Sequence, residues 1–227
     1  MSSRRDPDPL DVSDAAAMNR VLRHRLRNHS AGMKMTLGRI QDALSAAGSP
    51  LADRCVLMQS ELENLELFTR RLDLAFGILA DPESSTLLET VSRCRRYFVE
   101  NFPYCDFVMQ GEEAELRLVD GPLILTGLKE LLANAGEACS LEGRVSFAWE
   151  ILPGQLRFSV GNSSDSPLPP DIPLAPPRPF RTTRGRHDGL GLVIVRRCVD
   201  TLGGSLSIRQ SPDHTVRAEL TFPTETP

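Results

Sequence analysis

The chain has 227 residues, a formal net charge of −4 at pH 7 and a hydrophobic content of 41%, enough for one sizeable core and a further element. The acidic balance argues against a nucleic-acid binder, whose contact surface would be basic. No apolar run reaches the ~18 residues of a membrane span, so no span is expected. The five cysteines are odd in number and form no C-x-x-C pair; together with the lack of a signal-peptide pattern, this predicts reduced thiols and a cytoplasmic protein.

Residues 1–13 are polar and rich in proline and predict a loose tail. Residues 14–79 then show helical periodicity in two parts, separated by the helix-breaking "AAGSP" at 46–50. The apolar stripes are Leu22, Leu26, Met33, Leu37, Ile40 and Leu44 in the first part, and Met58, Leu62, Leu65, Leu72 and Phe76 in the second. This pattern predicts an antiparallel helical hairpin. Because one hairpin buries little surface, we expect it to pair with a second copy as a homodimeric four-helix bundle.

His24 lies in the first of these helices, within "RVLRHRLRNHS". It is two residues from Leu22 and two from Leu26, about 200° around the helix from each. We therefore expect it to face solvent, with Asn28 one turn later on the same face. Exposure suits an idle surface histidine and a reactive one equally well.

Residues 80–227 mix helices and strands. Helices are predicted over 85–102, 122–139 and 190–202, and strands over 105–109, 114–119, 145–151, 156–161, 205–210 and 216–222. This alternation predicts an α+β fold, a two-layer sandwich with the helices on one face of a mixed sheet. Residues 163–188 contain seven prolines and predict a long irregular loop, of the kind that forms lids.

Glu130 and Asn134 lie four residues apart in the helix "LKELLANAGEAC", so both side chains project from one face. A carboxylate and an amide oxygen at this spacing suit a Mg²⁺-nucleotide, with the amide as a ligand of the hard cation. An ordinary exposed polar pair is the alternative. Asn162 follows a buried strand, where its amide would read a base edge or simply begin a loop.

The segment "PFRTTRGRHDGLGLVIV" joins a basic loop to the start of an apolar helix. Its loop part contains Phe180, Thr182, Thr183 and Arg184. Gly189 and Gly191 follow, and they allow backbone N–H groups to approach phosphate oxygens closely. The helix N-terminus adds positive potential. Together these features predict a phosphate-binding segment.

These motifs, in this order and with G-G-x-L at 203–206, resemble the core of the sensor histidine kinases of two-component signalling. The catalytic domain of that family belongs to the GHKL ATPase superfamily, and the resemblance covers about residues 14–223. It implies a Bergerat-type site that uses ATP and Mg²⁺. His24 in "HRLRN" would match the phosphoacceptor of H-x-x-x-N, and Asn28 the amide that handles the phosphoryl group or attacking water.

The resemblance also implies roles in the second part of the chain. Glu130 would be catalytic and Asn134 the Mg²⁺ ligand. Further nucleotide contacts would come from Asn162, Phe180, Thr182, Thr183, Arg184, Gly189 and Gly191. The implied domains are a tail at 1–13, a dimerisation and phosphotransfer hairpin at 14–79, and a catalytic ATP-binding domain at 80–227.

Two motifs depart from the family pattern. Arg25 follows His24 where the family usually has an acidic residue. Asn162, Ser164 and Ser166 replace the aspartate and glycines of the first glycine box. Asn162 would accept from the adenine amino group through a neutral oxygen, without charge assistance.

The leading hypothesis is a histidine kinase core that binds Mg-ATP, autophosphorylates His24 and passes the phosphoryl group to an aspartate of a response-regulator receiver domain. The second is a histidine phosphotransfer protein that no longer binds ATP and relays phosphoryl groups between receivers. A silent scaffold that binds a partner through the hairpin is the third, and a serine kinase of the same superfamily is the least favoured. A separate sensor protein would bring the signal; nucleic acid is not an expected partner.

Overall fold

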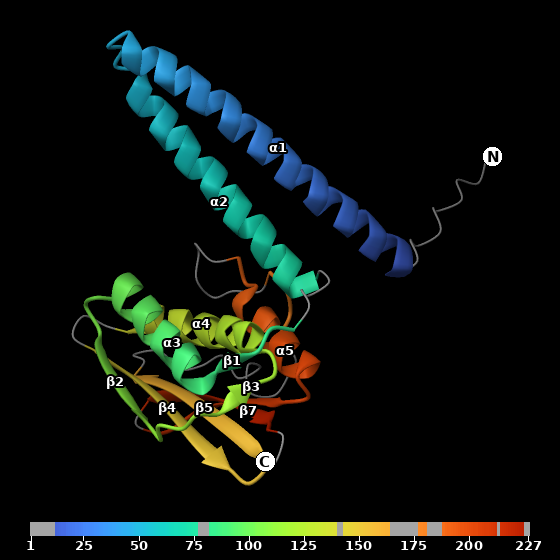
Figure 1. The fold of residues 1–227 in the computed structure, drawn as a ribbon, viewed down its shortest axis with the longest axis vertical. Coiled ribbons are helices and arrows are strands. Elements are labelled where there is room, and N and C mark those ends of the chain that lie inside the picture. The colour runs from blue at the N-terminus through green and yellow to red at the C-terminus, as the bar shows by residue number, and fades with distance from the viewer. Residues whose placement is uncertain are drawn as a thin grey trace, which may run out of the picture. The chain divides into compact units, whose positions relative to one another are not determined.

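The computed structural model describes residues 12–76, 82–139, 143–163, 177–180, 188–212 and 214–224, with side chains from residue 20 onward. The chain forms two compact units that divide between Leu79 and Ala80 (Figure 1). The first consists of two helices, and the second combines helices with strands. None of the helices in the described part of the chain has the length and apolar character needed to cross a bilayer.

The first unit is an antiparallel hairpin of α1 (Val12–Ala46) and α2 (Ala52–Phe76). Helix α1 ends in a hydrogen-bonded glycine turn: the Gly48 N–H donates to the Ser45 carbonyl and the Ser49 N–H to the Leu44 carbonyl. Gly48 has a φ of 63°, a left-handed conformation that glycine adopts at little cost. The break at 46–50 therefore has a specific backbone cause.

The residues buried between the two helices, called here the hairpin seam, are not the predicted stripe. Leu37 is buried as expected, but its heptad neighbours on α1 are Arg23 and Ser30; Cys55 and Thr69 are buried on α2. Several members of the predicted stripes are exposed in the single chain: Leu22, Leu26, Met33, Ile40 and Met58. The predicted stripe of α1 thus belongs to two faces, one inside the hairpin and one apolar face on its outside.

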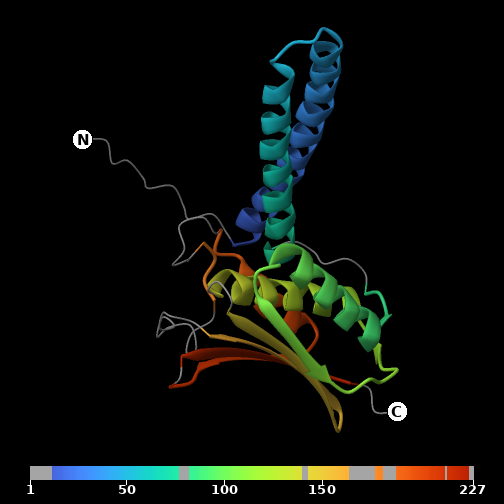
Figure 2. The same ribbon diagram turned by 90° about the vertical axis from the view of Figure 1, so that its left-hand side faces the viewer.

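The second unit is a two-layer α+β sandwich, as predicted. Its sheet has the order β2-β4-β5-β7-β6, in which β2 and β4 are parallel and the other neighbours antiparallel. The strands are β2 (Asp106–Gly111), β4 (Arg144–Leu152), β5 (Gln155–Ser163), β6 (Ser205–Gln210) and β7 (Thr215–Pro223). One face is covered by α3 (Leu87–Asn101), α4 (Gly121–Ala138) and α5 (Gly191–Thr201), as Figure 2 shows.

The core lies between the helices and the sheet. Alternate residues of the central strands point into it, among them Phe147 on β4 and Phe158 on β5, both fully buried. Their rings stack with centroids 6.0 Å apart, and Phe98 of α3 stacks on Phe107 of β2 at 4.2 Å. The period-two burial of β4 and β5 follows from strand geometry, and it fixes which face of the sheet meets α4.

The strand predicted over 114–119 is shorter than predicted and lies outside the main sheet. Only Arg117–Leu118 is a strand, β3, and it pairs with β1 (Ser85–Thr86) outside the main sheet. The prediction had placed 85–86 in a helix, but Thr86 is the N-cap of α3. Its hydroxyl accepts from the Glu89 N–H, and the Glu89 carboxylate accepts from the Thr86 N–H. This capping box fixes the helix start at Leu87 and leaves the two preceding residues extended.

Trp149, the only tryptophan of the chain, lies on β4 against Gly111 of the neighbouring β2. A Cβ at Gly111 would come within 2.3 Å of the indole carbons, so the ring occupies the space that any larger residue would need. The indole Nε1 donates to the Glu112 carbonyl at 2.8 Å. Trp149 therefore belongs to the packed structure of the second unit.

Two glycines of α4 provide a matched test of packing in this unit. A Cβ at Gly136 would lie 2.5–2.7 Å from ring carbons of the buried Phe102, whereas a Cβ at Gly127 would meet the Cys198 Cβ at 3.5 Å, an ordinary contact. We expect Gly136→Ala to lower the free energy of unfolding by about 1–3 kcal/mol through overpacking. Gly127→Ala should leave it unchanged or raise it by up to about 1 kcal/mol through helix propensity. Chemical denaturation of the full chain measures both; equal stabilities would contradict the packing argument.

Candidate functional site

Helix α4 presents Glu130 and Asn134 on a half-buried face that meets the start of α5. A Cβ at Gly191, the first residue of α5, would lie 3.1 Å from Glu130 Oε2, 3.6 Å from Asn134 Nδ2 and 3.7 Å from Asn134 Oδ1. Three residues singled out in the sequence, from two segments far apart in the chain, are thus brought together. Because glycine has no side chain, the α5 backbone approaches the polar pair closely.

The first turn of α5 begins at this meeting point. Gly189 has a φ of 67°, which directs the chain into the helix, and the fully buried Leu190 anchors it in the core. The Asp188 carboxylate accepts from the Leu190 N–H at 2.9 Å. The amides of a first helical turn carry partial positive charge and have no partner within their helix, so this turn is suited to an anion such as a phosphate group.

Cys198 lies two helical turns beyond Gly191 on the same face of α5, buried between α5 and α4. Burial, together with the negative charges of Glu130 and Asp120, raises the pKa of its thiol to about 12. Asp120 caps α4 by accepting from the Leu123 N–H at 3.2 Å. Cys198 therefore stays a neutral thiol at physiological pH and packs as a small apolar residue.

Asn162 lies near the end of β5 and is buried. Its amide nitrogen donates to the Ser163 carbonyl at 2.9 Å. With the nitrogen bonded to the backbone, the side-chain oxygen is the atom that could accept from a base edge. Ser164 and Ser166 of the divergent glycine box lie outside the described residues.

Of the loop predicted over 163–188, the structure describes Ser163, residues 177–180 and Asp188. Phe180 has a φ of 62°, uncommon for a residue other than glycine, and its side chain is 59% exposed. Thr182, Thr183 and Arg184 lie outside the described residues, so their predicted nucleotide contacts stay predictions.

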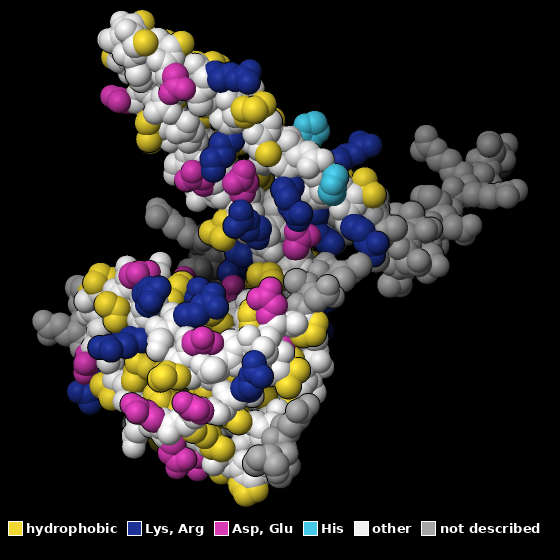
Figure 3. Space-filling view, in the orientation of Figure 1, with side chains coloured by type: hydrophobic (Ala, Val, Ile, Leu, Met, Phe, Trp, Pro, Cys, Tyr) yellow, Lys and Arg dark blue, Asp and Glu magenta, His cyan; other side chains and the backbone are white. Residues whose placement is uncertain are grey.

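In the hairpin, His24 is exposed, as expected from its place between Leu22 and Leu26. Asn28, one turn later, places its amide nitrogen 3.3 Å from His24 Nδ1. The contact leaves Nε2 as the outer nitrogen of the ring. Figure 3 shows the histidines of the hairpin on its surface, among Lys and Arg side chains.

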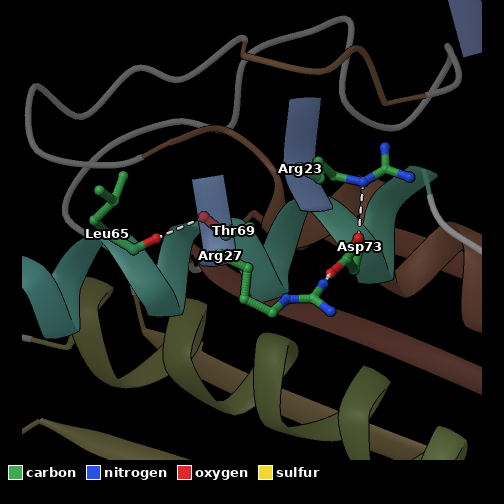
Figure 4. Close-up of polar contacts among 5 residues, drawn as sticks. All are labelled: Arg23, Arg27, Leu65, Thr69 and Asp73. Carbon is green, nitrogen blue, oxygen red and sulfur yellow. Dashed lines mark hydrogen bonds and ion pairs between the residues drawn. The ribbon is translucent and has the colours of Figure 1, made fainter. Parts of the chain in front are cut away.

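Next to His24 in sequence, Arg23 turns the other way, into the hairpin. Its Nε donates to Asp73 Oδ1 of α2 at 2.7 Å, and Arg27 Nη2 pairs with the other oxygen of the same carboxylate (Figure 4). The Arg23 side chain is 6% exposed and that of Asp73 31%. No local sequence pattern singles out Asp73; the heptad spacing of Arg23, Ser30 and Leu37 is the signal that these residues of α1 face α2.

The residues that the structure describes contain no group of three or more His, Cys, Asp or Glu side chains placed to hold a metal ion.

Comparison with known proteins agrees with this geometry. Residues 120–226 match the family model described as "Histidine kinase-, DNA gyrase B-, and HSP90-like ATPase". This segment spans α4, α5 and four strands of the sheet. A sequence search of curated proteins gives no match.

Solved structures extend the comparison. The catalytic domain of histidine kinase ThkA is 27% identical, with a TM-score of 0.57 over 64% of this chain and 97% of that one. ThkA in complex with response regulator protein TrrA is 23% identical (TM-score 0.60, 92% of this chain, 61% of that one). Full-length ShkA in complex with AMPPNP is 16% identical (TM-score 0.68, 90% and 47%). Because their identities are lower, the ThkA–TrrA and ShkA structures show likeness of fold only. The matched part of this chain includes both the hairpin and the sandwich.

Proposed function

We propose, from the premise that this chain is a sensor histidine kinase core, that it binds Mg-ATP, autophosphorylates His24 and transfers the phosphoryl group to an aspartate of a response-regulator receiver domain. The observation that carries the proposal is the approach of Gly191 to Glu130 and Asn134. It joins a phosphate-suited helix start to an oxygen ligand for Mg²⁺ and a carboxylate.

The residues of the second unit fit a Mg-nucleotide. Asn134 would hold Mg²⁺ through its amide oxygen, and the first turn of α5 after Gly189 would face the phosphates. Asn162 would accept from the adenine amino group through its side-chain oxygen, since its nitrogen is bonded to Ser163. Glu130 would orient the attacking group or the metal's water shell. Bound ATP supplies the γ-phosphoryl group, and these residues position it.

The hairpin supplies the acceptor. Asn28 holds the His24 ring at Nδ1, and rotation of its amide presents either nitrogen or oxygen to that atom. With the oxygen facing the ring, Nδ1 carries the proton and donates a hydrogen bond to the amide oxygen of Asn28. The lone pair then lies on Nε2, which is the nucleophile in this proposal. Arg25 stands where an acidic partner is usual, so Asn28 would take over the orientation of the ring.

The dimer and the partner follow from the same premise. The exposed apolar residues on the outside of α1, including Leu26, Met33 and Ile40 at heptad spacing, suit a second copy of the hairpin and a four-helix bundle. The structural neighbour ThkA forms a complex with a response regulator, which supports a receiver domain as the partner. A cytoplasmic location and a separate sensor protein stay predictions.

Titration calorimetry of the full chain with AMPPNP, with and without Mg²⁺, tests the nucleotide half of the proposal. We expect saturable binding that is tighter with Mg²⁺, because Asn134 would hold the cation that neutralises phosphate charge. Absence of binding under both conditions would contradict the kinase and favour the second reading.

That second reading, a phosphotransfer protein, is favoured by one feature: Asn162 and two serines stand where the family has an aspartate and glycines. Incubating the chain with a phosphorylated receiver domain tests it. Phosphoryl transfer to His24 together with failed nucleotide binding would establish a relay without kinase activity.

A further inference from the structure

The part of the hairpin seam that lies away from the turn at 46–50, around His24, contains several buried polar residues. Arg23, Ser30 and Thr69 are buried there. Thr69 satisfies its hydroxyl within α2, by donating to the Leu65 carbonyl at 2.8 Å. Ser30 Oγ is buried and has no hydrogen-bond partner among the described residues. Ala75, near the end of α2, is buried as well, and the ion pairs of Asp73 join α1 to α2 at this level.

The Asp73 carboxylate joins α2 to two positions of α1. It holds the nearly buried Arg23 through Nε at 2.7 Å and also pairs with Arg27, one turn later (Figure 4). A buried guanidinium is costly unless it is paired, so Arg23 has a strong reason to stay on Asp73. Because Arg23 and Arg27 lie on successive turns, their pairing with Asp73 fixes both the position of α1 along its axis and its rotation about that axis.

His24 lies between these two anchors. It follows Arg23 by one residue and precedes Arg27 by three, so it projects roughly 80° around the helix from the direction of Asp73 at ~100° per residue. An atom at the rim of a helix, ~6 Å from its axis, moves ~1 Å for each ~10° of rotation. A displacement of ~1 Å in a reacting atom can cost ~100-fold in rate. Small changes at Asp73 would therefore reach His24 Nε2.

We propose that Asp73 is a positioning residue for His24: by clamping Arg23 and Arg27 it sets the rotation of α1 and thereby the direction of the imidazole. The proposal rests on the proposed function of His24 as phosphoacceptor. Asp73 also lies three residues before the end of α2 at Phe76, beyond which the chain continues to the second unit. A change in the last turn of α2 would thus be transmitted to the acceptor histidine through this carboxylate.

The test compares Asp73→Asn with a matched control, Glu63→Gln. Glu63 also lies on α2 and pairs with a cation of α1, Lys34, at 3.1 Å, but this pair is exposed and lies farther along the hairpin. Both changes remove one negative charge. Single-turnover labelling of His24 from Mg-ATP gives a rate constant and an amplitude. The rate constant does not depend on the fraction of folded molecules, whereas the amplitude does.

For Asp73→Asn we expect a rate constant lowered at least ~10-fold, with unchanged amplitude and unchanged KM for ATP. Glu63→Gln should stay within twofold of the parent chain, and Asp73→Glu, which keeps the charge, should fall between the parent and Asp73→Asn. A rate constant for Asp73→Asn equal to that of Glu63→Gln would overturn the proposal. If Asp73→Asn fails to fold, Asp73→Glu decides: a parental rate constant overturns the proposal, and a lowered one supports it.

Hydrogen exchange of the same variants provides a second test of the proposal that needs no nucleotide. We expect amides of residues 20–28 to exchange at least ~10-fold faster in Asp73→Asn than in Glu63→Gln, while those of residues 37–44 are unchanged. If the parent chain shows no labelling at all, the proposed function fails. Hydrogen exchange alone then decides whether Asp73 fixes α1 through Arg23 and Arg27. Equal exchange at residues 20–28 in the two variants would then overturn it.

Discussion

Replacing His24 with alanine is expected to abolish phosphorylation of the chain. With Mg-ATP carrying label in the γ-phosphate, the parent chain should acquire an acid-labile, base-stable adduct, the behaviour of a phosphorus–nitrogen bond. Alanine provides no nucleophile at this position, so the labelling rate should fall at least ~1,000-fold. Nucleotide binding should not change, because His24 belongs to the hairpin and the predicted nucleotide contacts belong to the second unit.

His29 provides the matched control. It is the other exposed histidine of α1, and His29→Ala removes the same group five residues along the same helix. We expect its labelling to stay within twofold of the parent chain. Persistent label in His24→Ala, or loss of label in His29→Ala alone, would move the acceptor away from His24.

Replacing Asn134 with alanine is expected to uncouple Mg²⁺ from nucleotide binding. Asn134 lies with Glu130 beside Gly191, and its amide oxygen is the proposed protein ligand of the cation. Loss of that ligand should weaken the binding of Mg-AMPPNP ~10- to 100-fold and slow labelling of His24 ~100-fold or more. Calorimetry and the labelling assay measure the two effects.

The metal dependence separates a ligand from a merely structural residue. In EDTA, the parent chain and Asn134→Ala should bind nucleotide equally, because no cation is left to lose. Asn101→Ala, the same change at the exposed end of α3, should behave as the parent chain; the Asn101 amide only bonds back to the Tyr97 carbonyl of its own helix. Equal loss of affinity with and without Mg²⁺ would contradict the role of Asn134 as a metal ligand.

The sequence was sufficient to predict the sandwich because its elements carry strong local signals. Strands β4 and β5 alternate buried and exposed residues, and α4 has apolar residues at helical spacing up to its C-terminus. The four-residue separation of Glu130 and Asn134 placed them on one face without any tertiary information. The family order of the motifs then implied that Gly191 belongs to the same nucleotide site, and the structure brings the three residues together.

The hairpin was predicted less well, because periodicity alone does not say which of two neighbouring stripes lies inside. Leu22, Leu26, Met33 and Ile40 look like core residues by composition, and Arg23 and Ser30 do not. In the structure Arg23 and Ser30 face α2, because Asp73 compensates the charge of Arg23. Asp73 lies 50 residues after Arg23 in the sequence, so no local pattern could reveal the pair. The same limit applies to β3, whose partner Ser85–Thr86 lies before α3.

The position of the single indole has a practical consequence. The hairpin contains neither tryptophan nor tyrosine, since Trp149, Tyr97 and Tyr104 all belong to the second unit. Intrinsic fluorescence of the intact chain therefore reports on the sandwich alone, through a ring fixed against Gly111 at the edge of its sheet. Far-ultraviolet dichroism, to which the long helices contribute strongly, reports on both units. Comparing the two signals during one titration separates unfolding of the hairpin from unfolding of the second unit without cutting the polypeptide.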